Sequence, residues 1–237
     1  MSAPTGLRER KKEQTRRLIA DVARRLFAEQ GFEAVTVADI AREADVAPKT
    51  VFNYFPTKED LFYSRLEEFE EAMLAAVRER EPGQSVLAAF RGFLLGQGGV
   101  LAMGKAQDEE ATRQLRTVTR VITESPALLA RERQVMSRYE EALAALIADE
   151  VGARPDAVEP RAVANSLLGL HRALIAYVRD RVAAGERASQ IRRGVRVQAK
   201  RAFAQLESGL GEYAVKERRG AAASGAGCCR GARVGRT

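Results

Sequence analysis

Apolar residues recur at helical spacing along most of the chain. Near the amino end, Val37, Ile40, Ala41 and Ala44 are spaced so that they share one side of a helix. After residue 58 the same spacing continues, and it predicts helices at 58–81, 85–95, 109–123, 126–150, 160–184 and 188–210. No stretch alternates apolar and polar residues for long enough to predict a sheet. The pattern therefore predicts an all-α fold.

Start and stop signals divide segment 36–62 into two short helices, a turn and the entry to a third helix. Thr36 and Asp39 have the spacing of a capping box, in which each side chain bonds the backbone N–H of the other residue. Thr57 and Asp60 repeat that spacing. Two helices joined by a tight turn form a unit that can place its second helix in a groove of DNA.

The second short helix begins at Pro48, whose missing N–H would have no partner in a first turn, and it stops before Pro56. We expect three of its residues to project outwards, where they can touch neighbouring base edges: Lys49, Thr50 and Asn53. We expect three apolar residues to anchor it: Val51, Phe52 and Phe55. The helix therefore has the character of a base-reading helix.

Residues 12–62 resemble the DNA-binding domain of the TetR family of bacterial transcriptional regulators. The resemblance rests on the apolar positions of the first helix and on the tract 49–61, which contains Phe55-Pro56-Thr57-Lys58. It implies that Thr36, Tyr54 and Lys58 hold phosphate oxygens. Ala47 and Phe52 depart from the family, in which a hydroxyl-bearing residue is common at each position. The predicted DNA-contacting set is Thr36, Pro48, Lys49, Thr50, Asn53, Tyr54 and Lys58.

The ends of the chain differ from its middle in composition and charge. Residues 8–25 hold eight basic residues against three acidic ones, an excess that favours contact with phosphates. Residues 218–237 hold five arginines and no acidic residue, so much of the net charge of +7 lies in this tail. We expect four regions: a flexible basic arm at 1–12, a helix-turn-helix DNA-binding domain at 13–62, a helical effector-binding and dimerisation domain at 63–215, and a disordered Gly/Ala/Arg tail at 216–237.

Localisation and redox chemistry follow from what the sequence lacks. No apolar run approaches the roughly 20 residues that span a bilayer, and the first residues do not form an export signal. Cys228 and Cys229 are adjacent, so a disulfide between them could not link distant segments of the fold, and they do not have metal-site spacing. We expect a cytoplasmic protein with no metal and no cofactor.

Two late helices, at 160–184 and 188–210, carry more apolar surface than one side of a helix needs. The resemblance implies that they pair with a second subunit to form a homodimer. The alternative is that both stripes close the core of a single chain. The candidate dimer residues are Leu167, Leu170, Leu174, Val178, Ile191, Val195, Ala202 and Leu206.

A binding site for a small-molecule effector is the further property that the resemblance implies. His171 is the only histidine and lies in a helix that is apolar on two sides, so it is either a core residue or a ligand contact. Arg116 and Arg120 are one turn apart and could hold an anion, or else form ion pairs on a wet face. The candidate effector residues are Phe69, Phe90, Phe93, Met103, Arg116, Arg120, Met136, Tyr139 and His171.

These features favour a transcriptional regulator, a repressor released from a palindromic operator by a small molecule. An effector-independent DNA-binding regulator and an architectural DNA-binding protein are the alternatives. One histidine, two tail cysteines and no clustered metal ligands leave little for nucleophilic or metal catalysis, so we expect no enzyme.

Overall fold

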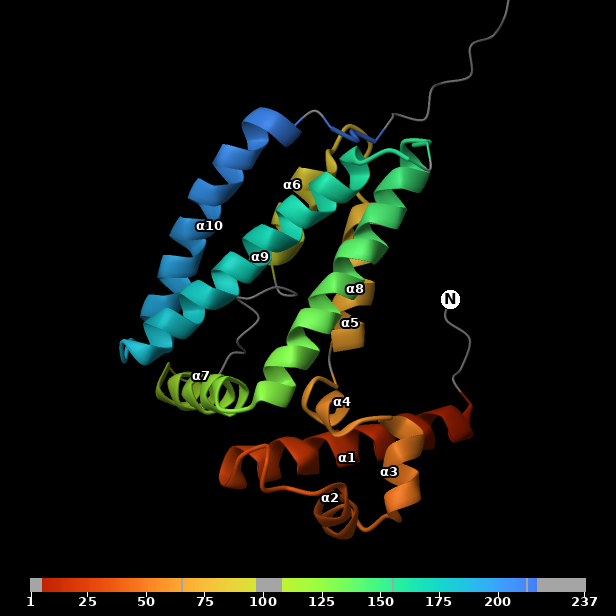
Figure 1. The fold of residues 1–237 in the computed structure, drawn as a ribbon, viewed down its shortest axis with the longest axis vertical. Coiled ribbons are helices and arrows are strands. Elements are labelled where there is room, and N and C mark those ends of the chain that lie inside the picture. The colour runs from red at the N-terminus through yellow and green to blue at the C-terminus, as the bar shows by residue number, and fades with distance from the viewer. Residues whose placement is uncertain (1–5, 65, 97–107, 155, 212, 217–237) are drawn as a thin grey trace, which may run out of the picture.

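The chain folds as two groups of helices, one above the other (Figure 1). The computed structural model describes residues 6–64, 66–96, 108–154, 156–211 and 213–216. These described residues contain ten α-helices and no β-strand. The expected all-α fold is confirmed for this part of the chain.

The amino-terminal unit consists of helices α1 to α4, which span Leu7–Gln30, Val37–Glu43, Pro48–Tyr54 and Lys58–Phe62. Both predicted capping boxes are present, Thr36 with Asp39 at the start of α2 and Thr57 with Asp60 at the start of α4. Asp45 turns the chain between α2 and α3 in a left-handed conformation with φ of 53°. Aspartate tolerates that conformation better than most side chains do. The two capping boxes and the left-handed turn at Asp45 therefore set where these short helices begin and end.

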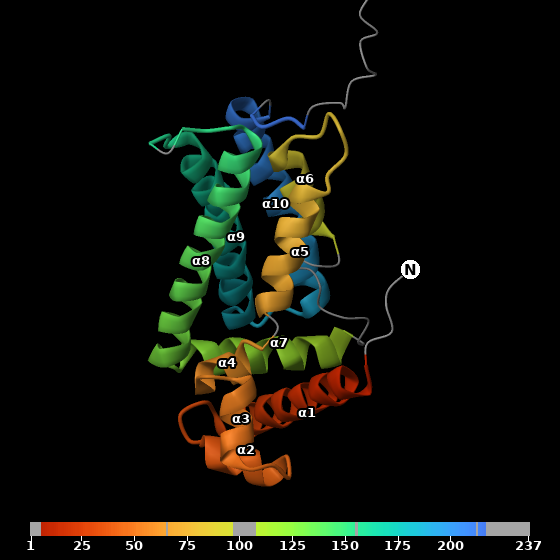
Figure 2. The same ribbon diagram turned by 90° about the vertical axis from the view of Figure 1, so that its right-hand side faces the viewer.

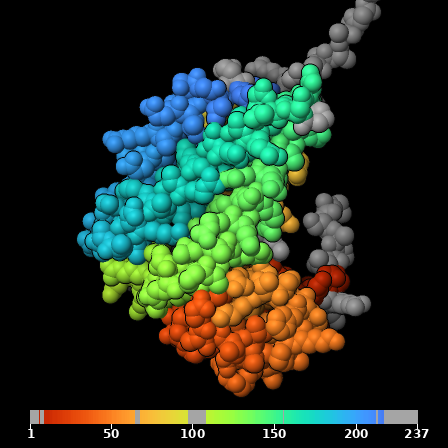
Figure 3. All heavy atoms as spheres, viewed as in Figure 1, coloured from red at the N-terminus to blue at the C-terminus, as the bar shows by residue number. Residues whose placement is uncertain are grey.

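The body consists of helices α5 to α10, which span Leu66–Arg78, Val86–Leu95, Asp108–Thr123, Pro126–Glu150, Glu159–Ala183 and Ala188–Leu210. Helix α7 lies crosswise between the amino-terminal unit and the other helices of the body (Figure 2). The long helices α8, α9 and α10 lie next to one another on one face (Figure 3). No helix in the described ranges is long and apolar enough to cross a membrane.

Most predicted helix boundaries agree with the structure to within one to three residues, and two differ in a way that changes the architecture. The helix expected at 58–81 is interrupted, because α4 ends at Phe62 and α5 begins at Leu66. The Tyr63 hydroxyl donates a hydrogen bond to the carbonyl of Leu128 in α8 at 3.2 Å, so packing against a distant helix overrides the local helical pattern here. Residues 7–12, which we expected in a flexible arm, belong to α1; Glu9 lies in its first turn, where the helix dipole favours an acidic residue.

The core of the amino-terminal unit is completed by residues of the body. Phe27, Ile40, Val51 and Leu61 are fully buried in it. The same cluster contains Val121 and Ile122 from the end of α7 and Leu128 from the start of α8. The Ser125 hydroxyl, between these two helices, also donates to the Glu33 carboxylate at 2.6 Å. The α7–α8 corner is therefore part of the unit that carries the helix-turn-helix.

Candidate DNA-binding surface and effector region

Helix α3 presents one polar face and one anchoring face. Lys49 and Asn53 are exposed, and Thr50 is half-buried. Val51 and Phe55 are buried as predicted, but Phe52 is 50% exposed and does not anchor the helix. The reason is spacing, because residues three and four apart share a helix face, so Phe52 lies beside Lys49 rather than beside Val51. The outer face of α3 therefore combines Lys49, Phe52 and Asn53.

The hydroxyl of Thr36 is already engaged within its own helix cap. It accepts a hydrogen bond from the Asp39 N–H at 3.1 Å and donates one to the Asp39 carboxylate at 2.6 Å. Hydrogen bonds from Thr36, with help from Arg42, lower the pKa of Asp39 to about 2, so the cap holds a carboxylate at neutral pH. A phosphate contact through the Thr36 side chain stays a prediction, and it would compete with Asp39.

Lys58 connects α4 to the loop before α2. Its Nζ donates a hydrogen bond to the carbonyl of Val35 at 2.9 Å and lies 4.2 Å from the centre of the Phe32 ring. An ammonium group has three donors, so a phosphate contact remains sterically compatible with this bond. Lys58 is therefore a structural brace as well as a predicted phosphate contact.

Ion pairs locally neutralise some of the basic side chains of the amino-terminal unit. Three of the basic residues between positions 8 and 25 pair with nearby carboxylates, in the pairs Arg17–Glu13, Arg24–Asp21 and Arg25–Glu43. Lys11 and Lys12 are exposed in the first half of α1. The charge available to phosphates is therefore concentrated towards the start of α1.

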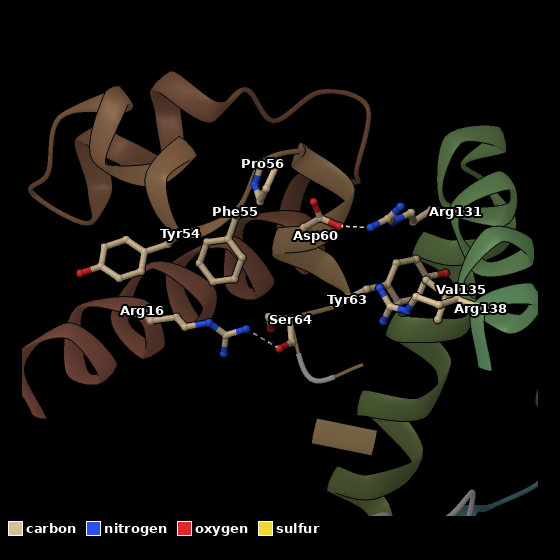
Figure 4. Close-up of a pocket in the computed structure, with 10 residues that line it drawn as sticks. All are labelled: Arg16, Tyr54, Phe55, Pro56, Asp60, Tyr63, Ser64, Arg131, Val135 and Arg138. Atoms are coloured by element: carbon tan, nitrogen blue, oxygen red, sulfur yellow. Dashed lines mark hydrogen bonds and ion pairs between the residues drawn. The ribbon is translucent and has the colours of Figure 1, made fainter. Parts of the chain in front are cut away.

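The joint between the two units is built from α4, its following turn and α8 (Figure 4). Arg131 of α8 donates to the Asp60 carboxylate at 2.6 Å, and Asp60 at the same time caps α4. A cavity of about 150 Å³ lies beside this pair, and its lining includes Tyr54, Tyr63 and Arg138. Burial raises the pKa of Tyr63, which keeps its hydroxyl protonated and able to donate to α8. A displacement of α8 would therefore pull on Asp60 and move the start of α4.

Four predicted effector residues come together as an aromatic cluster inside the body. The Phe69 ring is stacked on Tyr139 at 5.5 Å and on His171 at 5.2 Å between ring centres, and Phe93 meets Phe69 edge-on at 5.2 Å. His171 is only 5% exposed, and burial lowers its pKa to about 4. These residues come from α5, α6, α8 and α9. We call Phe69, Phe93, Tyr139 and His171 the aromatic cluster.

The remaining predicted effector residues lie elsewhere. Phe90 packs near Phe203 of α10 and Met136 is buried, so both are core residues. Arg116 donates to the carbonyl of Gly185 at 2.9 Å, and Arg120 donates to the carbonyl of Ala28 in α1 at 3.1 Å. These two arginines tie α7 to other parts of the chain and do not converge on the aromatic cluster, so their assignment to one effector site is corrected. Met103 lies outside the described residues.

The predicted dimer residues differ in whether they also line a groove on the surface. All of them except Ala202 and Leu206 are buried in the body core. Leu167, Ile191 and Val195 are at most 1% exposed in the single chain, so these three belong to its own core. Their burial does not support the predicted place in the interface, because this apolar side of α9 and α10 faces the chain's own core. A largely apolar groove of about 570 Å³ runs along the other side, and among its lining residues are Leu170, Leu174, Ala202 and Leu206. Val178 is buried in the body core.

Comparison with known proteins identifies the family. The profile for bacterial regulatory proteins of the tetR family matches residues 19–64, and the profile of the MftR C-terminal domain matches residues 98–211. The transcriptional regulator MftR of Mycobacterium tuberculosis is 30% identical over 175 residues, which cover 71% of this chain and 80% of that protein. The chain belongs to the TetR family.

A second relative and a solved structure are also similar to the chain. The transcriptional regulator TcmR of Streptomyces glaucescens is 32% identical over 147 residues, which cover 62% of this chain. That match spans 65% of TcmR, a little under two thirds of its length. The structure of Salmonella enterica GusR superposes with a TM-score of 0.51 at 21% identity, covering 84% of this chain and 96% of that one. The likeness to GusR shows the fold.

Proposed function

We propose that this TetR-family chain is a sequence-specific DNA-binding repressor that binds a palindromic operator as a homodimer and is released by a small molecule. The observation that carries the proposal is the outer face of α3. Its exposed residues differ in chemistry, a cation in Lys49, an apolar ring in Phe52 and an amide in Asn53. Such side chains distinguish base pairs in the major groove, because each base pair presents its own donors, acceptors and methyl group there.

The proposed homodimer uses the groove between α9 and α10. Leu170, Leu174, Ala202 and Leu206 line it together with Tyr177, so a second copy would cover an apolar surface. A twofold axis beside these helices would set two α3 helices for successive major grooves, roughly 34–36 Å apart. Palindromic recognition follows from that symmetry.

The proposed release depends on the joint between the two units. Leu128 packs in the amino-terminal core and Arg131 binds Asp60, and both residues belong to α8. The same helix carries Tyr139 of the aromatic cluster. A ligand that prefers a different placement of α8 would change the placement of α3 and lower the affinity for DNA by its differential affinity for the two states.

The test begins with selection of a preferred sequence from random duplex DNA by the full chain, followed by titrations at several salt concentrations. We expect Lys49→Ala to lower discrimination at one or two base pairs by about 1–3 kcal/mol. Lys11→Ala is the matched control that removes the same charge from α1; it should weaken all sequences alike and reduce the salt slope by about one.

Two results would reject this assignment. If Lys49→Ala and Lys11→Ala lowered the affinity for selected and random DNA by the same factor, α3 would not be the helix that reads the bases. A chain that is monomeric by light scattering and shows no preference among duplexes at moderate salt would reject the whole proposal. A dimer with a specificity ratio near one would instead favour an architectural DNA-binding protein.

A further inference from the structure

His171 brings an unpaired polar atom into the aromatic cluster. Its side chain is more than nine-tenths buried, and Nδ1 has no hydrogen-bond partner among the described residues. Buried polar atoms in proteins are nearly always paired, since an unpaired one loses its hydration without compensation. An aliphatic or phenyl side chain would fill a purely apolar position without this loss. The nitrogen therefore points to a polar partner in the cluster.

Two arginines next to the cluster are already paired with carboxylates. Arg172, the neighbour of His171, pairs with Glu140. Arg138, whose guanidinium lies over the Tyr139 ring, pairs with Glu70 at 2.7 Å. Burial holds the imidazole neutral over the physiological range. A charged molecule beside His171 would lose its hydration and find no counter-charge in the four rings, which selects for a neutral one.

The rings of the cluster differ in exposure. Tyr139 is fully buried, whereas Phe69 and Phe93 are half-buried. Phe69 is nearly parallel to both Tyr139 and His171, with interplanar angles of 27° and 23°. A flat molecule can stack against the partly exposed Phe69 ring and contact the Phe93 ring, because offset stacking and edge-on contact are both favoured arrangements of aromatic rings.

We propose that the aromatic cluster binds a neutral, planar aromatic molecule that carries a hydroxyl group, with its ring against Phe69 and Phe93 and its hydroxyl on His171 Nδ1. With the proton of the neutral imidazole on Nε2, Nδ1 is an acceptor, and a hydroxyl can donate to it. This inference rests on the proposed ligand-responsive function and adds the chemical class of the ligand.

The chain offers a direct measurement, because His171 is its only histidine. In a chain labelled with ¹⁵N-histidine, imidazole nitrogen resonances report this one side chain. The probes are phenol, anisole and benzoate, which share a benzene ring and differ in the hydroxyl and the charge. We expect phenol to shift the Nδ1 resonance and to bind about tenfold more tightly than anisole, since only phenol can donate to the nitrogen. Benzoate should leave the resonance unchanged.

Substitution at His171 isolates the hydrogen bond from the stacking. His171→Phe keeps an aromatic ring of similar size and removes the nitrogen. We expect its affinity for phenol to fall about tenfold, to that for anisole, while its affinity for anisole stays the same. The comparison of phenol with anisole on the unchanged chain gives the same information if the variant does not fold.

The outcomes separate this inference from the proposed function. Binding of benzoate as tight as that of phenol, or no movement of the His171 resonances with any probe, would overturn the ligand class and leave the selected DNA sequence intact. If phenol moves the resonances and binds as expected, the ligand class stands even when DNA affinity is unchanged. In that case it is the ligand-controlled release that fails.

Discussion

The amino-terminal unit and the body are specified in different ways. In the amino-terminal unit, α2 and α4 each begin with a capping box that joins residues three positions apart. In the body, the defining contacts join distant segments, such as Phe69 of α5 with His171 of α9. Short-range signals therefore specify the fold of the amino-terminal unit, and the matching of helix faces specifies the fold of the body. Substitutions that alter packing or capping, and the protonation of a buried group, should therefore change the stability of the two units by different amounts.

The largest effect should come from the place where the two parts meet. Leu128→Ala removes a fully buried side chain from the α7–α8 corner and leaves a cavity in the amino-terminal core. We expect the free energy of unfolding to fall by about 2–5 kcal/mol, measured by urea denaturation. The exposed Val118→Ala in α7 is the control and should change it by less than about 0.5 kcal/mol. Similar values for both would mean that the amino-terminal core closes without the body.

Mild acid should weaken the body through His171. Its pKa of about 4 in the folded chain lies below the ordinary value of 6.5, so the unfolded chain binds more protons between these values. Stability should therefore be lost as pH falls from about 6.5 towards 4, by about 3 kcal/mol in full. His171→Phe should lack this component in a pH series of denaturation curves. If the unchanged chain and His171→Phe lost stability in parallel as the pH falls, burial would not lower the pKa of His171.

Packing between α9 and α10 depends on a glycine. A Cβ atom at Gly194 would lie 2.2 Å from the hydroxyl oxygen of Tyr177. We expect Gly194→Ala to lower the free energy of unfolding by about 1–3 kcal/mol, because the Tyr177 ring must leave its place or the two helices must shift. Tyr177→Phe removes that oxygen and should restore part of the loss in the double variant. Independent, additive effects of the two changes in thermal denaturation would contradict this contact.

The smallest effect should come from helix caps, which differ in their consequence for DNA. Thr57→Ala removes the cap of α4, and Ser85→Ala removes the cap of α6, where the Ser85 hydroxyl accepts from the Ala88 N–H. Each should lower the free energy of unfolding by about 1 kcal/mol. Only Thr57→Ala should also weaken DNA binding, as measured by fluorescence anisotropy. Equal loss of DNA affinity in both variants would mean that caps act through global stability alone.

Short-range signals were sufficient to predict much of the fold. Ser125 and Pro126 mark the start of α8, which spans Pro126–Glu150 as expected. The interruption after Phe62 was not predictable, because it depends on contacts between Tyr63 and α8. The apolar character of Phe52 predicts an anchor, but its spacing from Lys49 places it on the outer face, where the structure exposes it.

The candidate sites show the same limit. A helix with apolar residues on two sides does not reveal which side meets its own chain, so Leu167 and Leu170 could not be separated by sequence. Both are buried in the single chain, and only Leu170 also lines the groove. The stacking of Phe69 on His171 likewise requires the packing of distant helices and has no signal in the spacing of either residue.

The completion of the amino-terminal core by Val121, Ile122 and Leu128 has a practical consequence for engineering. A chimera that grafts residues 1–64 onto the ligand domain of another regulator would leave one side of that core without its matching surface. The transplant should include the α7–α8 corner, or replace its three side chains with residues of equal shape on the recipient. The segment to exchange together with the amino-terminal unit is therefore discontinuous in sequence.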